Sequence, residues 1–143
     1  MYKRLELHNH TNESDAVFTC KELTDFMVAD QVDAFALTDH NTISGHCKIK
    51  NYLKEHPQPI DFIPGMEYTT YYGHILCLNL TEYVPWENIN RHKPELLFRA
   101  ARKKGALVGV AHPYSFGWPF AQGCRFEMTI TDYSVSYTHL TLP

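Results

Sequence analysis

Residues 34–42 read AFALTDHNT, four apolar residues followed at once by polar ones. A short run that is apolar throughout is typical of a β-strand covered on both faces. Asp39 and His40 then follow at the carboxyl end of this strand. In α/β folds the carboxyl ends of the strands meet on one side of the sheet and carry the reactive side chains. This stretch therefore predicts an α/β fold with its site at that edge.

The same order of strand, polar loop and helix recurs on both sides of this run. Leu5 and Leu7 alternate with polar residues, which predicts a short strand. Thr19 and Glu22 have the spacing of a capping box and predict the start of a helix. The alternation favours a parallel sheet or barrel, although strand 73–78 follows its predecessor too closely for an intervening helix. The other expected elements are a helix from about residue 44 that ends before residue 57, strands over 61–67 and 106–111, and a helix over 94–104.

Composition limits the class of protein. The 143 residues, 44% of them hydrophobic, are enough for one domain with a single core. The net charge of -3 gives no broad basic face, so stable nucleic-acid binding is not expected, while nucleic acid stays open as a substrate. No stretch has the length and hydropathy of a signal or a membrane span, which predicts a cytoplasmic protein without membrane partners. The four cysteines lack CxxC pairing and are expected to be reduced.

Histidines gather where strands are expected to end or begin. Imidazole nitrogen suits zinc, iron or manganese, and two histidines two residues apart on an extended strand, such as His8 and His10, can chelate one ion. Asp39 can orient the neighbouring His40. The carboxylate of Glu67, which ends a strand, can bridge two cations. Five of the nine histidines have such a position: His8, His10, His40, His74 and His112.

Each of these residues also has an ordinary structural interpretation. The His-x-His pair can be two surface histidines, Asp39 can cap the next helix, and Glu67 can be a solvated loop residue. His74 and His112, taken singly, are more often hydrogen-bonded structural histidines than ligands. Several imidazoles and carboxylates buried on one face are nevertheless costly without cations to offset them. Their coincidence therefore favours a metal site.

Four blocks of the sequence also occur in a distinctive order. They are HNHTNESD at 8–15, ALTDHNT at 36–42, PGMEYTTYYGHIL at 64–76 and VAHPYSFG at 110–117. This succession resembles the polymerase and histidinol phosphatase (PHP) family of metallohydrolases. The last two blocks, with GCRFEM at 123–128, are most similar to its carbaryl-hydrolase-like branch. We assign residues 5–132 to one such domain and interpret the Thr/Tyr/Ser-rich run 133–143 as a non-native or unstructured tail.

The resemblance implies a fold and a set of ligands. The fold is a distorted (β/α)7 barrel, incomplete at the C-terminus, with two or three divalent zinc, manganese or iron ions. By position, His8 and His10 bind one ion. Glu67 bridges it to a second ion, which His74 and His112 hold.

The same comparison assigns the remaining site residues. Asp15 and His40 serve a third ion. Asp39 is the candidate catalytic residue, either as a proton-handling group or as an outer-shell partner of a ligand. The family closes its site with a later Asp-x-His motif, which nothing after residue 112 supplies. We therefore expect a truncated chain whose metal binding or activity is reduced.

The function that the resemblance favours is hydrolysis of phosphoester bonds of a small molecule or nucleotide by a metal-activated water. Hydrolysis of carbamates or other esters is the alternative that the branch suggests. Two further alternatives are a PHP module that serves a DNA polymerase and a non-catalytic domain that binds metal or a partner. The near-neutral charge and the branch argue against the polymerase module.

Overall fold

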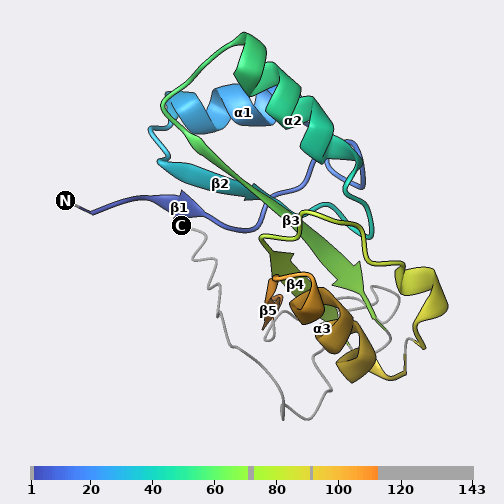
Figure 1. Ribbon diagram of the computed structural model, residues 1–143. Coiled ribbons are helices and arrows are strands. Elements are labelled where there is room, and N and C mark those ends of the chain that lie inside the picture. The colour runs from blue at the N-terminus through green and yellow to red at the C-terminus, as the bar shows by residue number, and fades with distance from the viewer. Residues whose placement is uncertain (1, 71–72, 91, 113–143) are drawn as a thin grey trace.

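The computed structural model describes residues 2–70, 73–90 and 92–112, whose arrangement is shown in Figure 1. The helices are α1 (Cys20–Ala29), α2 (Ser44–Glu55) and α3 (Pro94–Lys103), with a 3-10 turn η1 (Trp86–Asn88). The strands are β1 (Leu5–Glu6), β2 (Ala34–Leu37), β3 (Asp61–Thr69), β4 (His74–Leu78) and β5 (Leu107–Val110). The predicted extension of the domain to residue 132 and the predicted tail 133–143 lie outside the described residues.

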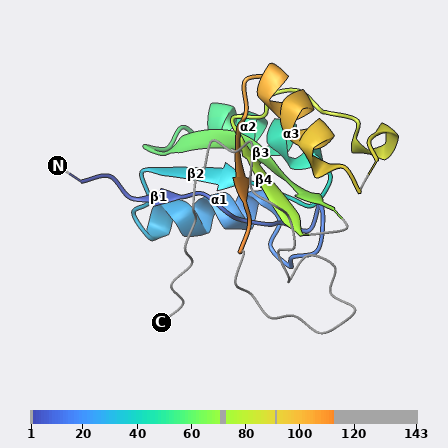
Figure 2. The same ribbon diagram turned by 90° about the horizontal axis from the view of Figure 1, so that it is seen from below.

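The five strands form one mixed sheet in the order β1-β2-β3-β4-β5. β1, β2 and β3 are parallel, whereas β4 is antiparallel to both β3 and β5. The predicted α/β class is confirmed, but the expectation of a parallel sheet is wrong at β4, because four residues between β3 and β4 are too few for a crossover connection. The sheet curls into a half barrel, as Figure 2 shows. A seven-stranded barrel stays a prediction, since the described ranges hold five strands.

The helices begin and end at the residues that the sequence marks. At the start of α1 the Glu22 amide donates to Thr19 Oγ1 over 3.2 Å, and the Thr19 amide donates to Glu22 Oε2 over 2.8 Å, which completes the capping box. α2 ends two residues before Pro57. α3 opens with Pro94 and is followed by Gly105, whose φ is +81°. Within the described ranges, no helix has the length and apolar character needed to cross a membrane.

Two apolar layers attach the helices to the sheet. α1 and α2 cover β2 through a core that includes Phe35, Leu37 and Ile49, each no more than 1% exposed. α3 covers β4 and β5 through Leu97 and Val108. In Figure 1 the α1–α2 pair and α3 accordingly lie at opposite ends of β3. The two layers hold the long strand β3 along its whole length.

β3 gains a second neighbour midway, at Gly65. Its first four residues pair with β2, and the residues from Gly65 to Thr69 pair with β4. A Cβ atom on Gly65 would lie 2.8 Å from the Cys77 carbonyl oxygen and 3.1 Å from the Leu37 carbonyl oxygen. Glycine is therefore required where the three strands meet. Two residues further along β3, the chain reaches Glu67.

Candidate metal centre

Glu67 is a fully buried carboxylate, 0% exposed, surrounded by imidazole rings. Glu67 Oε2 lies 2.7 Å from His8 Nε2 and 3.0 Å from His10 Nε2. Glu67 Oε1 lies 2.9 Å from His74 Nδ1 and 3.0 Å from His112 Nε2. A fifth ring is slightly more distant, with its Nε2 atom 3.7 Å from Glu67 Oε2, and belongs to His40.

The topology of the sheet brings these residues together. His8 and His10 follow β1, and His40 follows β2, where it forms an isolated parallel bridge with Glu67 on β3. His74 stands at the start of β4, and because β4 runs antiparallel, its start lies beside the end of β3. The same reversal allows His112, two residues after the end of β5, to reach the cluster. Four strand ends and one strand start therefore meet at one edge.

The imidazoles keep Glu67 ionised. Burial acts to raise the pKa of the Glu67 carboxyl, but the hydrogen bonds with His10, His112, His74 and His8 outweigh it and hold that pKa far below its usual range. The Glu67 carboxylate is therefore the anionic group of these contacts, which include no lysine or arginine. A negative charge enclosed by imidazoles suits a cation that several ligands share.

The pKa values of His10 and His40 shift in opposite directions. Burial lowers the pKa of His10, but the hydrogen bond and the charge of Glu67, helped by Asp15 and Asp39, raise it above the usual value overall. Burial lowers the pKa of His40, and repulsion by His10 and His74 adds to this, so that the attraction of Glu67 does not compensate. His40 thus favours the neutral form, in which a ring nitrogen can bind a metal.

Three overlapping groups of side chains have the spacing of metal ligands, with donor atoms in each group within 4.8 Å of one another. Asp15 belongs to one of these groups. Its Oδ2 atom lies 3.5 Å from His40 Nε2, and its Oδ1 atom lies 3.7 Å from His10 Nδ1. Its side chain is 65% exposed, so this group faces solvent, unlike the two groups around Glu67. The groups are His8, His10 and Glu67; His10, Asp15 and His40; and His40, Glu67 and His74.

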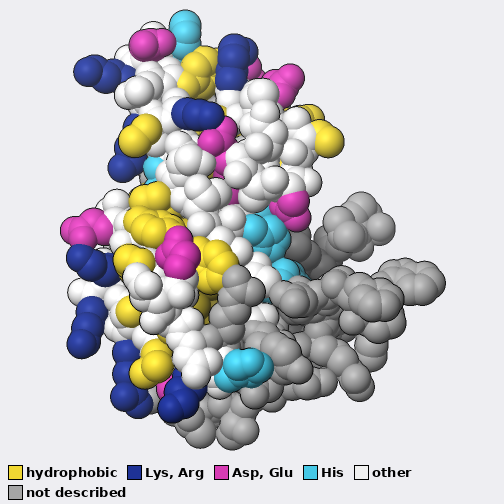
Figure 3. Space-filling view, turned by 90° about the vertical axis from the view of Figure 1, so that its right-hand side faces the viewer, with side chains coloured by type: hydrophobic (Ala, Val, Ile, Leu, Met, Phe, Trp, Pro, Cys, Tyr) yellow, Lys and Arg dark blue, Asp and Glu magenta, His cyan; other side chains and the backbone are white. Residues whose placement is uncertain are grey.

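Unpartnered ring nitrogens support the fit of this donor set to divalent ions. His10 Nδ1, His74 Nε2 and His112 Nδ1 are buried without a hydrogen-bond partner among the described residues. A buried polar atom without a partner is uncommon and calls for an explanation, of which an ion is one. All seven predicted ligands thus lie in or beside one cluster, although His112 contacts Glu67 without belonging to any of the three groups. Figure 3 shows histidine side chains grouped beside acidic ones in the middle of one face.

Asp39, the predicted catalytic residue, contacts the loop between β1 and α1. It is 1% exposed, and its Oδ1 atom accepts hydrogen bonds from the Thr11 amide over 2.6 Å and from Ser14 Oγ over 2.7 Å. Its Oδ2 atom accepts from Thr11 Oγ1 over 2.7 Å. Thr11 and Ser14 are not among the residues predicted for the site. The signal that could have identified them is the presence of two hydroxyl residues between the expected ligands His10 and Asp15.

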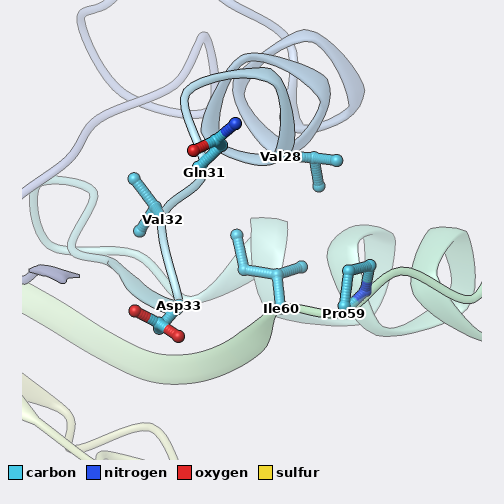
Figure 4. Close-up of a pocket in the computed structure, with 6 residues that line it drawn as sticks. All are labelled: Val28, Gln31, Val32, Asp33, Pro59 and Ile60. Atoms are coloured by element: carbon cyan, nitrogen blue, oxygen red, sulfur yellow. The ribbon is translucent and has the colours of Figure 1, made fainter. Parts of the chain in front are cut away.

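A hollow at the opposite edge of the sheet, where β2 and β3 begin, is unrelated to this cluster (Figure 4). Its only ionisable lining residue is Asp33, whose Oδ2 atom accepts a hydrogen bond from the Arg4 amide over 2.8 Å. None of the predicted site residues lines it. The lining residues are Val28, Gln31, Val32, Asp33, Pro59 and Ile60.

The chain is similar in sequence to proteins of other organisms. An uncharacterized protein of Methanocaldococcus jannaschii, MJ1587, is 28% identical over 123 residues, which are 78% of this chain and 68% of that protein. The 5'-3' exoribonuclease Rnm of Escherichia coli is 30% identical over 116 residues, covering 73% of this chain and 40% of the exoribonuclease. The chain therefore spans less than half the length of that enzyme.

The fold also matches a solved structure. A two-domain protein from Bacteroides vulgatus, described as containing a predicted PHP-like metal-dependent phosphoesterase, superposes with a TM-score of 0.69 at 22% identity. The match covers 86% of this chain and 42% of that one. The model of the PHP domain family matches residues 6–140, nearly the whole sequence. The chain belongs to the PHP domain family.

Proposed function

We propose that this chain is a metal-dependent phosphoesterase domain that hydrolyses phosphoester bonds of a small molecule or nucleotide. The observation that carries the proposal is the ring of five imidazoles around the buried, ionised Glu67. Five imidazoles around one carboxylate form a donor set that suits divalent cations, and no serine or cysteine stands within this set of contacts. The relatives described above support hydrolysis of phosphoesters as the chemistry.

The ligands divide into an inner and an outer set. In the inner set, His8 and His10 would hold one ion, and His74 and His112 would hold a second, with the Glu67 carboxylate available to both. Divalent ions of zinc, manganese or iron would supply polarisation of the scissile bond and a nucleophilic water at neutral pH. The buried carboxylate orients the rings that contact it, because one oxygen faces His8 and His10 and the other faces His74 and His112.

The outer set consists of Asp15 and His40, with His10 shared between the two sets. Because the Asp15 side chain is largely exposed, an ion held there would be open to solvent and to substrate. A phosphoryl group is anionic and would neutralise charge at this opening, whereas a neutral carbamate or ester would not. This difference in charge favours phosphoesters over the carbamates that the carbaryl-hydrolase-like blocks suggest.

The test uses the purified chain, stripped of metal and then reloaded separately with Mn²⁺, Zn²⁺ or Fe²⁺. Bound ions are counted by elemental analysis, and hydrolysis is followed with bis-p-nitrophenyl phosphate, a nucleoside monophosphate, p-nitrophenyl acetate and an aryl carbamate. We expect ion binding and faster hydrolysis of the two phosphoesters. Release of product from the carbamate or acetate alone would instead favour the carbamate and ester alternative.

A pair of variants separates the site from the rest of the molecule. The double substitution His8→Ala and His10→Ala removes two ligands of the inner set, whereas His56→Ala removes an exposed histidine at the end of α2. We expect the double variant to lose bound metal and hydrolysis while its circular dichroism spectrum is retained, and the control to behave like the wild type. Wild-type protein that is folded and binds no divalent ion would contradict the proposal.

A further inference from the structure

We propose that Asp39 is a positioning residue that fixes the loop 9–15 against the end of β2, so that His10 and Asp15 face His40. The inference concerns the metal centre and in that respect rests on the proposed function. It replaces the alternative that Asp39 handles protons. A proton-handling group must reach water or substrate, and the Asp39 carboxylate is 1% exposed with both oxygens bonded to the loop.

The hydrogen bonds of the Asp39 side chain fall on the stretch between two ligands. Thr11 directly follows His10, and it gives Asp39 both its amide and its hydroxyl. Ser14 directly precedes Asp15, and its hydroxyl oxygen lies 2.7 Å from Asp39 Oδ1 and 3.2 Å from Asp15 Oδ1. One carboxylate therefore holds the loop at two points, each next to a ligand.

A second set of bonds joins the same loop to the same strand end. The Thr38 amide donates to the Asn9 carbonyl oxygen over 2.8 Å, and the Asn9 amide donates to Thr38 Oγ1 over 3.1 Å. The Asn9 side chain donates to the Ala36 carbonyl oxygen over 3.1 Å. These bonds fix the first residue of the loop. Of its later residues, Glu13 accepts hydrogen bonds from Ser44 and Lys48 of α2. Thr11 and Ser14, which adjoin the ligands, bond Asp39.

The loop needs such an anchor because it lies between elements. Residues 9–15 lie outside any helix or strand, so no helical or sheet ladder sets their positions. The Asp15 side chain is 65% exposed and packs little, and its 3.5 Å approach to His40 therefore depends on where its backbone is held. Outer-shell partners of this kind commonly change metal affinity about 10- to 100-fold when they are removed.

Substitution by asparagine or alanine distinguishes the two roles. An asparagine can keep its oxygen toward the Thr11 amide and Ser14 and turn its amino group to the Thr11 hydroxyl, which can accept as well as donate. Asp39→Asn thus retains the anchor but removes the group that could exchange a proton. Asp39→Ala removes both. A positioning role predicts that Asp39→Asn retains the metal affinity and the fixed loop that Asp39→Ala loses.

Metal binding is the first readout, measured by titration of the full chain with Mn²⁺. We expect Asp39→Ala to weaken the binding of one ion about 10- to 100-fold, and Asp39→Asn to stay within about threefold of the wild type. The double variant Thr11→Val and Ser14→Ala removes the two hydroxyls that donate to Asp39, and its metal affinity is expected to resemble that of Asp39→Ala. The matched control is Asp25→Ala on α1, an exposed carboxylate that bonds Lys21 and is expected to have no effect.

The second readout needs no metal. The Thr11 amide donates to Asp39, so its hydrogen exchange in the metal-free protein is expected to accelerate at least about tenfold in Asp39→Ala and to stay slow in Asp39→Asn. If the wild type binds no ion, the proposed function fails. The exchange of the Thr11 amide still tests whether Asp39 anchors the loop. The inference would be overturned if folded Asp39→Ala had the metal affinity and the Thr11 amide exchange rate of the wild type. It would also be overturned if Asp39→Asn lost metal affinity and exchange protection as strongly as Asp39→Ala.

Discussion

Gly65→Ala tests whether the crossing of three strands sets the geometry of the metal centre. The added Cβ would lie 2.8 Å from the Cys77 carbonyl oxygen, 3.0 Å from Thr38 Cγ2 and 3.1 Å from the Leu37 carbonyl oxygen. Two of these neighbours are backbone atoms of β2 and β4, which cannot rotate away as a side chain can. Ordinary contact begins at 3.4 Å, so the strands must separate by up to about 0.6 Å.

This separation has a cost in stability and a consequence for the site. Overpacking a closely packed interior usually costs about 1–3 kcal/mol. For a domain of this size, that corresponds to a fall in melting temperature of about 2–12 °C. β2 leads into His40 and β3 into Glu67, whose side chains are 3.7 Å apart, so a shift between the two strands also moves ligands relative to each other. We expect affinity for a divalent ion to fall at least about tenfold.

Thermal unfolding by circular dichroism and titration with Mn²⁺ measure the two effects. Gly105→Ala is the control, since its φ of +81° makes alanine unfavourable by about 1–2 kcal/mol while nothing lies within 4 Å of the new methyl group. It should lower the melting temperature and leave metal affinity unchanged. A Gly65→Ala protein with wild-type melting temperature and wild-type affinity would show that β3 has room at this point and would refute the reasoning.

Three further predictions concern charge. Glu67→Gln should reduce the number of ions bound per folded chain by elemental analysis, because an amide cannot bridge two cations. Asp15→Asn should weaken one ion about tenfold in calorimetry and leave the others, because Asp15 belongs to a single ligand group. Burial lowers the pKa of His46 below 6.5, so the unfolded chain binds more protons and stability falls as pH drops below about 6.5, by up to about 1.4 kcal/mol per pH unit. His46→Gln should remove this part of the slope, as measured by urea unfolding at pH 7.5 and 5.5.

Local patterns were enough to predict most of the elements and several of the side chains that gather around Glu67. The capping box of Thr19 and Glu22 marks the start of α1, and the proline of α3 marks its start, because both act within one helical turn. The apolar run before His40 indicated a buried strand, and residues 34–37 are all buried. Such signals depend on neighbours in sequence, and a single sequence is sufficient to find them.

Contacts between distant segments could not be predicted in the same way. The direction of β4 follows from its short connection to β3, but its pairing on both sides with β3 and β5 is set by burial of the whole sheet. His46 is not among the histidines expected at strand ends, and no sequence pattern indicates that its Nε2 atom lies 2.8 Å from the Gly65 carbonyl oxygen. The bonds of Asp39 to Thr11 and Ser14 likewise depend on the path of a loop that has no periodic pattern.

The backbone of Glu67 explains why its carboxylate can serve as the centre of the cluster. Its amide donates to the Asp39 carbonyl oxygen over 3.2 Å, and its carbonyl oxygen accepts from the Asn41 amide over 2.9 Å, while Leu76 pairs with it from β4. The strand is thus fixed from both sides at the residue that carries the central charge. A ligand held by backbone bonds on rigid strands needs little reorganisation when a cation binds. The exposed Asp15 has no such support from the sheet, and its position must come from the loop that Asp39 anchors.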